Sequence, residues 1–155
     1  MSVRGETAKS LAAFRTVLLN QGKWIYFLTK EGIDMGLSGQ FAKDAMYELG
    51  EVYADEKYAE CDTLEKLRDS MMDRAMTEGF GAKAKLSGEE LRIDIAYDPM
   101  YRLWSELTDD QAELEMLCEV ACEFYRGLAD KKGMPFERTP ADGANDGAFA
   151  LIFRV

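Results

Sequence analysis

The sequence predicts an α+β fold in a single domain that spans residues 1–155. Apolar residues recur at helical spacing up to Met76, whereas residues 91–97 alternate between apolar and polar side chains as a half-buried strand does. Helices and strands are therefore segregated along the chain, which favours helices packed on one face of an antiparallel sheet. With 47% hydrophobic residues, a chain of this length can bury one core.

Three helices are expected before the first strand. Thr7 can cap the first, which ends near Gly32 and carries apolar residues at Leu11, Phe14, Leu18, Trp24 or Ile25, and Leu28. Ser38 opens the second, whose apolar stripe reaches Tyr53. Asp62 to Glu65 is typical of a capping box, and a third helix is expected from Thr63 to Glu78.

The second half of the chain is expected to hold two hairpins around a helical pair. The expected elements are strands at Phe80 to Leu86 and Leu91 to Tyr97 around Ser87-Gly88, helices from Met100 to Leu107 and from a Thr108 cap to about Lys132-Gly133, and strands at Met134 to Thr139 and Gly147 to Val155 joined by the turn-rich segment Asp142 to Gly147.

Composition excludes several classes of function. The net charge of -10 makes nucleic acid and anionic membranes poor partners. The chain has no histidine, which removes Ser-His-Asp and Cys-His catalysis and every histidine-containing metal site. Three cysteines and no apolar leader or membrane-length segment indicate a reduced, cytoplasmic protein. The sequence assigns no residue to a metal and leaves the identity of any cofactor unknown.

Two cysteines and several carboxylates could carry chemistry. Cys118 and Cys122 are four residues apart and share a helix face with Leu114, Leu117, Ala121 and Tyr125, so core packing is favoured over a nucleophile or ligand contact. Asp94 and Asp98 flank the end of a strand, where burial could raise a carboxyl pKa into a useful range. Asp98 is also a good helix cap, and Glu115, Glu119 and Glu123 are typical of a solvated face.

Short motifs over roughly residues 38–155 resemble a known family. They are Phe41-Ala42-Lys43, Tyr47-Glu48-Leu49-Gly50, Met100-Tyr101-Arg102, Cys118, Phe124-Tyr125-Arg126-Gly127, Glu137-Arg138-Thr139, Ala141 to Asn145 and Phe149. In these the chain resembles the L-2-amino-thiazoline-4-carboxylic acid hydrolase-like family, which is related in architecture to vinyl-reductase-type ligand-binding domains. Where that family places a Cys-Asp pair before the last phenylalanine, this chain has Gly147-Ala148.

The resemblance implies a hydrolase that opens a ring C-N or C=N bond of a small cyclic sulfur- or nitrogen-containing acid. The residues assigned to it are Cys118, Cys122 and Asp98 for catalysis and Tyr97, Tyr101, Trp104, Arg138 and Phe149 for substrate binding. In that role the planar fork of Arg138 would pair with a substrate carboxylate.

Two alternatives remain open at the sequence level. The same cavity could belong to a non-catalytic module that binds a small apolar molecule or assists a partner enzyme. Alternatively, an exposed apolar stripe on the helix from Thr63 to Glu78 would favour a structural subunit that docks another protein. Homodimerisation is compatible with either, and no residue selects an interface.

Overall fold

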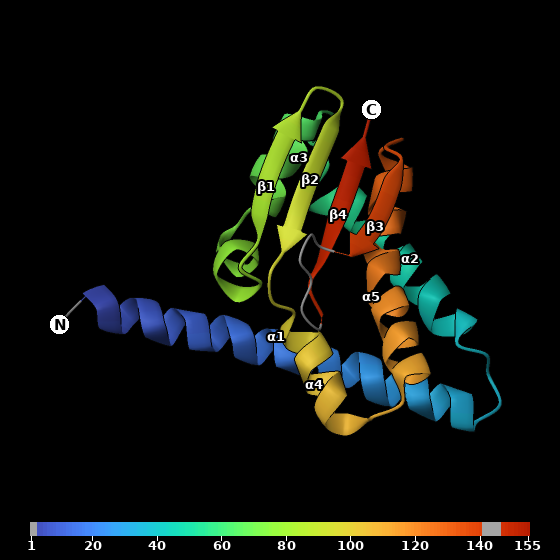
Figure 1. Cartoon of the computed structure of the whole chain (residues 1–155). Helices are drawn as coiled ribbons and strands as arrows, with labels where there is room; N and C mark the ends of the chain where they lie inside the picture. Colours follow the sequence, from blue (N-terminus) through green and yellow to red (C-terminus); the bar gives the residue numbers. More distant parts are fainter. Residues whose placement is uncertain (1–2, 141–146) are drawn as a thin grey trace.

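The computed structural model describes residues 3–140 and 147–155 and confirms the α+β class (Figure 1). Its helices are α1 Val3–Asp34, α2 Gln40–Glu56, α3 Leu64–Met71, the π-helical turn η1 Ala75–Gly79, α4 Pro99–Leu107 and α5 Gln111–Lys131. Its strands are β1 Lys83–Ser87, β2 Glu90–Ile95, β3 Phe136–Pro140 and β4 Phe149–Arg154.

The four strands form one antiparallel sheet in the order β1-β2-β4-β3. Ile93 at its centre lies between Ala84 of β1 and Leu151 of β4. Helix α3 packs behind β1 and β2 and α5 behind β3, so these helices share one face (Figure 1). The inward-facing residues Leu91 and Ile93 are fully buried, as the alternation predicts.

The sequence-based helix boundaries need several corrections. Helix α1 starts earlier than Thr7, at Val3, and continues to Asp34. The third helix is cut in two, because α3 ends at Met71 and the Asp73 carboxylate then accepts a hydrogen bond from the backbone N–H of Met76 at 3.0 Å. Such a side-chain acceptor competes with the helical ladder and starts a new turn.

Two caps also differ from expectation. Thr63, not Asp62, caps α3 by accepting from the Lys66 N–H, and Asp110, not Thr108, caps α5 by accepting from the Ala112 N–H. Both residues are good N-caps and lie within two positions of the predicted ones. Of the turn predicted from Asp142 to Gly147, residues 142–146 lie outside the described residues.

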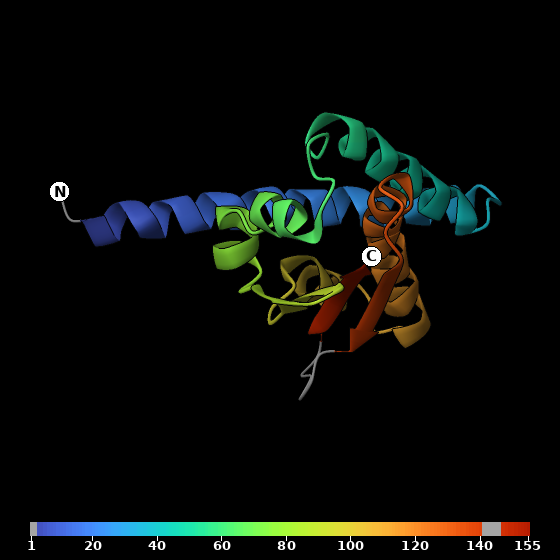
Figure 2. The same cartoon turned by 90° about the horizontal axis from the view of Figure 1, so that it is seen from above.

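Helix α1 is a long rod seated on α4, and its N-terminal part projects beyond the rest of the molecule (Figures 1 and 2). The Nε1–H of Trp104, a fully buried side chain, donates to the carbonyl oxygen of Gly22 at 2.8 Å. Gly22 leaves room for this contact, because a side chain there would press on Met100 and Leu103. This buried hydrogen bond fixes α1 to the short helix that follows β2.

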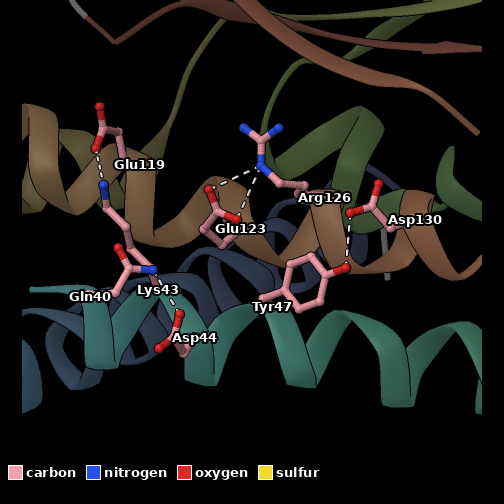
Figure 3. A network of polar contacts seen from close by, with 8 residues as sticks. All are labelled: Gln40, Lys43, Asp44, Tyr47, Glu119, Glu123, Arg126 and Asp130. Atoms are coloured by element: carbon pink, nitrogen blue, oxygen red, sulfur yellow. Dashed lines mark hydrogen bonds and ion pairs between the residues drawn. The ribbon is translucent and has the colours of Figure 1, made fainter.

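Helices α2 and α5 cross almost backbone to backbone. A methyl group at Gly50 would overlap the Phe124 carbonyl oxygen, and one at Gly127 would overlap the Tyr47 carbonyl oxygen. Polar side chains bridge the same pair, with Lys43 paired to Glu119 and the Tyr47 hydroxyl donating to Asp130 at 2.9 Å (Figure 3). The two glycines thus set the distance between these helices.

Replacing either glycine should separate the helices. We expect Gly50→Ala and Gly127→Ala each to lower the free energy of unfolding by roughly 1–3 kcal/mol, because backbone atoms cannot yield as a side-chain tip can. Gly39→Ala is the matched control, since its φ of -59° suits any residue and only the flexible Met116 thioether lies close. Chemical denaturation would measure all three, and a control as destabilised as the other two would contradict this account.

Candidate functional site

A pocket of about 590 Å³ lies between α1, α2 and α5 and extends to the strands β3 and β4. Its lining is mainly apolar and comprises Val17, Leu18, Asn20, Gln21, Trp24, Ile25, Met46, Leu49, Tyr53, Phe80, Asp98, Met100, Cys118, Ala121, Cys122, Phe124, Tyr125, Arg138 and Phe149. This volume is within the roughly 300–1,000 Å³ of typical small-molecule sites. The pocket is the leading candidate for a ligand site.

The charged groups of the lining are Arg138 and Asp98. The Arg138 guanidinium stacks over the Phe149 ring at 4.9 Å from its centroid, and both side chains line the pocket. Arg138 makes no hydrogen bond or ion pair within the described part of the chain, whereas Asp98 accepts one from the Met100 N–H at 2.8 Å. An arginine with free donors beside an apolar space is suited to an anionic group of a ligand.

Burial raises the pKa of Asp98, the side chain that caps α4. The residue is 7% exposed, and this desolvation outweighs the backbone N–H groups of Met100 and Tyr101 and the charge of Arg138, all of which favour the carboxylate. The group therefore serves first as a helix cap, and its charge is costly at this position.

The two thiols of α5 are buried and poorly ionised. Burial raises the pKa of Cys118 to about 11 and that of Cys122 to about 12, although the nearby charge of Arg138 acts in the opposite direction. A nucleophilic cysteine needs a thiolate, which these surroundings disfavour at neutral pH. Both thiols act here as small apolar parts of the pocket wall.

A second hollow of about 420 Å³ continues the pocket along α1. The two share the lining residues Val17, Leu18, Gln21, Tyr53, Phe80, Phe124 and Tyr125. The far part is lined by Lys57 and Asp73, which form an ion pair at 3.3 Å. Together the hollows form an elongated apolar space under α1.

The structure brings five of the eight sequence-predicted site residues together. Asp98, Cys118, Cys122, Arg138 and Phe149 all line the pocket. The other three lie outside its lining: the Tyr97 ring lies under the Arg15 guanidinium at 5.6 Å, Tyr101 lies against Gly147, and Trp104 is buried against Gly22.

Sequence reasoning missed the wall that α1 and α2 contribute. Trp24 and Ile25 are alternatives for one stripe in the sequence, yet both line the pocket, and Met46, Leu49 and Tyr53 of α2 join them. The missed signal is the width of the apolar surface of α1. Leu18 and Ile25 mark one face, whereas Val17, Trp24 and Leu28 mark a second that is more than half exposed.

Within the described residues, no group of three or more cysteine or carboxylate side chains is placed to hold a metal ion. Among the helices of residues 3–140, none combines the length and the apolar composition that a membrane span would need.

No family model matches the chain, and no curated protein matches it either. Among solved structures, the chain is similar to one described as a trafficking protein particle complex subunit 3 from Naegleria fowleri covalently bound to palmitic acid. The match covers 92% of this chain and 95% of that one, with a TM-score of 0.53 and 14% sequence identity. At this identity the likeness establishes a shared fold.

This comparison corrects the prediction of a hydrolase, which is wrong. The predicted activity depended on a resemblance in short sequence motifs, whereas the fold of this chain is shared with a subunit of a trafficking complex. The protonated state of Cys118 and Cys122 removes the proposed nucleophiles as well. The alternative of a non-catalytic binding or accessory module agrees better with the comparison, and the resemblance in sequence motifs stays a prediction.

The raised pKa of Asp98 predicts a pH-dependent effect of Asp98→Asn, which keeps the helix cap. Because folded Asp98 holds its proton to higher pH than the unfolded chain, the wild type loses stability as pH rises above the ordinary aspartate pKa of about 3.9. The variant lacks this loss. We expect its unfolding free energy relative to wild type to increase across that window, as measured by denaturation at several pH values. A difference that is constant with pH would contradict the assignment.

Proposed function

We propose that this chain is a non-catalytic binding module whose pocket holds an elongated apolar molecule with an acidic end, of the fatty acid class. The observation that best supports this proposal is the apolar pocket, which continues into a second hollow along α1. A long flexible chain fits such a space better than a compact ring does. The palmitic acid in the structurally similar trafficking subunit supports the same ligand class.

Arg138 is the residue that we propose for the acidic end of the ligand. Its guanidinium is held in place by the Phe149 ring and has no hydrogen-bond partner in the described residues. The neighbouring Asp98 has a raised pKa, so it opposes an incoming carboxylate less than an ordinary aspartate would. The apolar chain would then extend between α1 and α5 toward Phe80.

We further propose that the ligand is held without a covalent bond. The trafficking subunit carries its palmitic acid covalently. In this chain the two thiols that face the pocket are buried, and their pKa values of about 11 and about 12 leave almost no thiolate for acyl transfer at neutral pH. Burial of apolar surface and the Arg138 contact would supply the affinity.

We also propose that the protein acts in the cytoplasm, where it can meet partner proteins. Supporting this, Cys61, Cys118 and Cys122 are all unpaired and buried. Unpaired thiols are usual in reducing compartments.

Native mass spectrometry of the freshly purified protein tests the proposal directly. We expect a complex whose excess mass matches a fatty acid and whose denatured chain returns to 17.5 kDa without an adduct. An adduct that survives denaturation would overturn the non-covalent assignment. If the native protein is bare and binds no added fatty acid of any chain length, the proposed function is wrong.

Arg138→Gln should distinguish the contribution of the ligand's acidic end to binding from the contribution of its apolar chain. We expect palmitic acid to bind roughly tenfold more weakly to the variant, because a charge-assisted hydrogen bond is lost, while hexadecanol binds equally to both proteins. Arg102→Gln is the control, since Arg102 is exposed on α4 and lies outside the pocket lining. Displacement of a fluorescent fatty acid would measure these affinities, and equal losses for acid and alcohol would exclude this role of Arg138.

A further inference from the structure

Exposed apolar side chains are concentrated on one side of the molecule. Of the twelve large apolar residues that are exposed in the described part of the chain, ten lie between Val17 and Tyr53, on α1, α2 and their connection. On α1, Val17, Trp24 and Leu28 are 56%, 70% and 60% exposed and follow one helical stripe. On α2, Leu49 and Tyr53 are 41% and 39% exposed.

Four of these residues, Val17, Trp24, Leu49 and Tyr53, line the pocket, which forms an open groove between the two helices. Helix α1 packs chiefly on α4 and α2 on α5, and α1 and α2 come together at their joined ends (Figures 1 and 2). There the Phe41 ring lies against Gly32. Farther from that connection the two helices diverge (Figure 2). We call the surface formed by Val17, Trp24, Leu28, Leu49 and Tyr53 the groove face. A concentration of exposed apolar side chains of this kind is typical of an interface.

Charge on the two helices is opposite in sign. Residues 11–30 of α1 contain three basic residues and no acidic one, although the whole chain has a net charge of -10. Residues 40–56 of α2 contain five acidic residues and one basic residue. Lys23 and Glu48 are exposed representatives of the two helices, and neither forms an ion pair within the described residues.

We infer that the groove face binds a second copy of this chain, in a two-fold dimer that sets α1 of each copy against α2 of the other. A symmetric interface brings the same face together from both copies, so the charge pattern selects the axis. A two-fold axis along the groove places basic α1 over acidic α2 twice. An axis across the groove would place α1 on α1, with like charges opposed. Because two chains of charge -10 repel, local complementarity of this kind is needed.

The dimer would also complete the pocket, although the inference does not depend on which ligand the pocket holds. Val17, Trp24, Leu49 and Tyr53 are exposed and line the pocket at the same time. A second copy on the groove face therefore covers the pocket mouth with apolar side chains, which removes both the exposed surface and the open end from water.

The first test replaces an apolar residue of the groove face that does not line the pocket. We expect the wild-type chain to sediment as a dimer at roughly 10–100 µM, and Leu28→Asp to weaken association by about 100-fold or more, because the change occurs twice in each dimer. Leu107→Asp is the matched control, since Leu107 is 39% exposed but lies on α4, away from this face. Circular dichroism verifies that both variants are folded.

The second test asks whether the occupant is a copy of this chain in the inferred arrangement. Lys23→Glu gives a chain that is acidic at both positions, and Glu48→Lys gives one that is basic at both. Each variant alone should dimerise about tenfold more weakly, and an equimolar mixture should recover association as a heterodimer, which native mass spectrometry distinguishes by mass.

Three results would overturn the inference. They are a wild-type monomer throughout the concentration range, a dimer that Leu28→Asp and Leu107→Asp weaken equally, and charge variants that do not rescue each other. A monomer that instead sediments with vesicles of neutral lipid would assign the groove face to a membrane surface. A fatty acid bound to a stable monomer would leave the proposed function in place while removing the dimer, so the two proposals fail separately.

Discussion

The close crossing of α2 and α5 is the constraint on which the rest of the structure depends. Gly50 and Gly127 allow the two backbones to touch, so α2 lies close against α5. The residues of α2 that face away from this contact form one side of the pocket. Helix α1 is held separately on α4, through the hydrogen bond that the Nε1–H of Trp104 donates to the carbonyl oxygen of Gly22. Because the two attachments are independent, α1 packs mainly on α4 and meets α2 near their connection, as far as the described residues show. The space left between them is the pocket.

Burial decides the chemistry of the groups that meet there. Cys118, Cys122 and Asp98 are residue types that catalysis uses, and the fold does bring them to one pocket. However, burial in these apolar surroundings raises all three pKa values. Arg138 is exposed, and its guanidinium is stacked on the Phe149 ring. The site is therefore suited to holding an anion and poorly suited to nucleophilic attack.

The periodicity of apolar residues predicted the helices and strands. It failed where a single polar side chain ends a helix or where residues far apart in the sequence come into contact. The hairpin around Ser87-Gly88 followed from strict alternation, and Asp98 as a cap followed from its place before Pro99. The break after Met71 depends on one hydrogen bond to Asp73, which leaves the apolar spacing unchanged. The pairing of β2 with β4, and the wall that α2 adds to the pocket, arise from contacts between residues far apart in the sequence. No local pattern encodes such contacts.

The pocket and the inferred dimer together give a physical explanation for the broad apolar surface of α1. A helix that packs on one neighbour needs one apolar stripe, and α1 has that stripe where it faces α4 and the pocket. The second stripe, at Val17, Trp24 and Leu28, is more than half exposed and leaves apolar area in water in an isolated chain. Its presence is understandable if the same residues serve a ligand from one side and a second subunit from the other. Ligand retention and association would then be coupled, because each covers surface that the other leaves exposed.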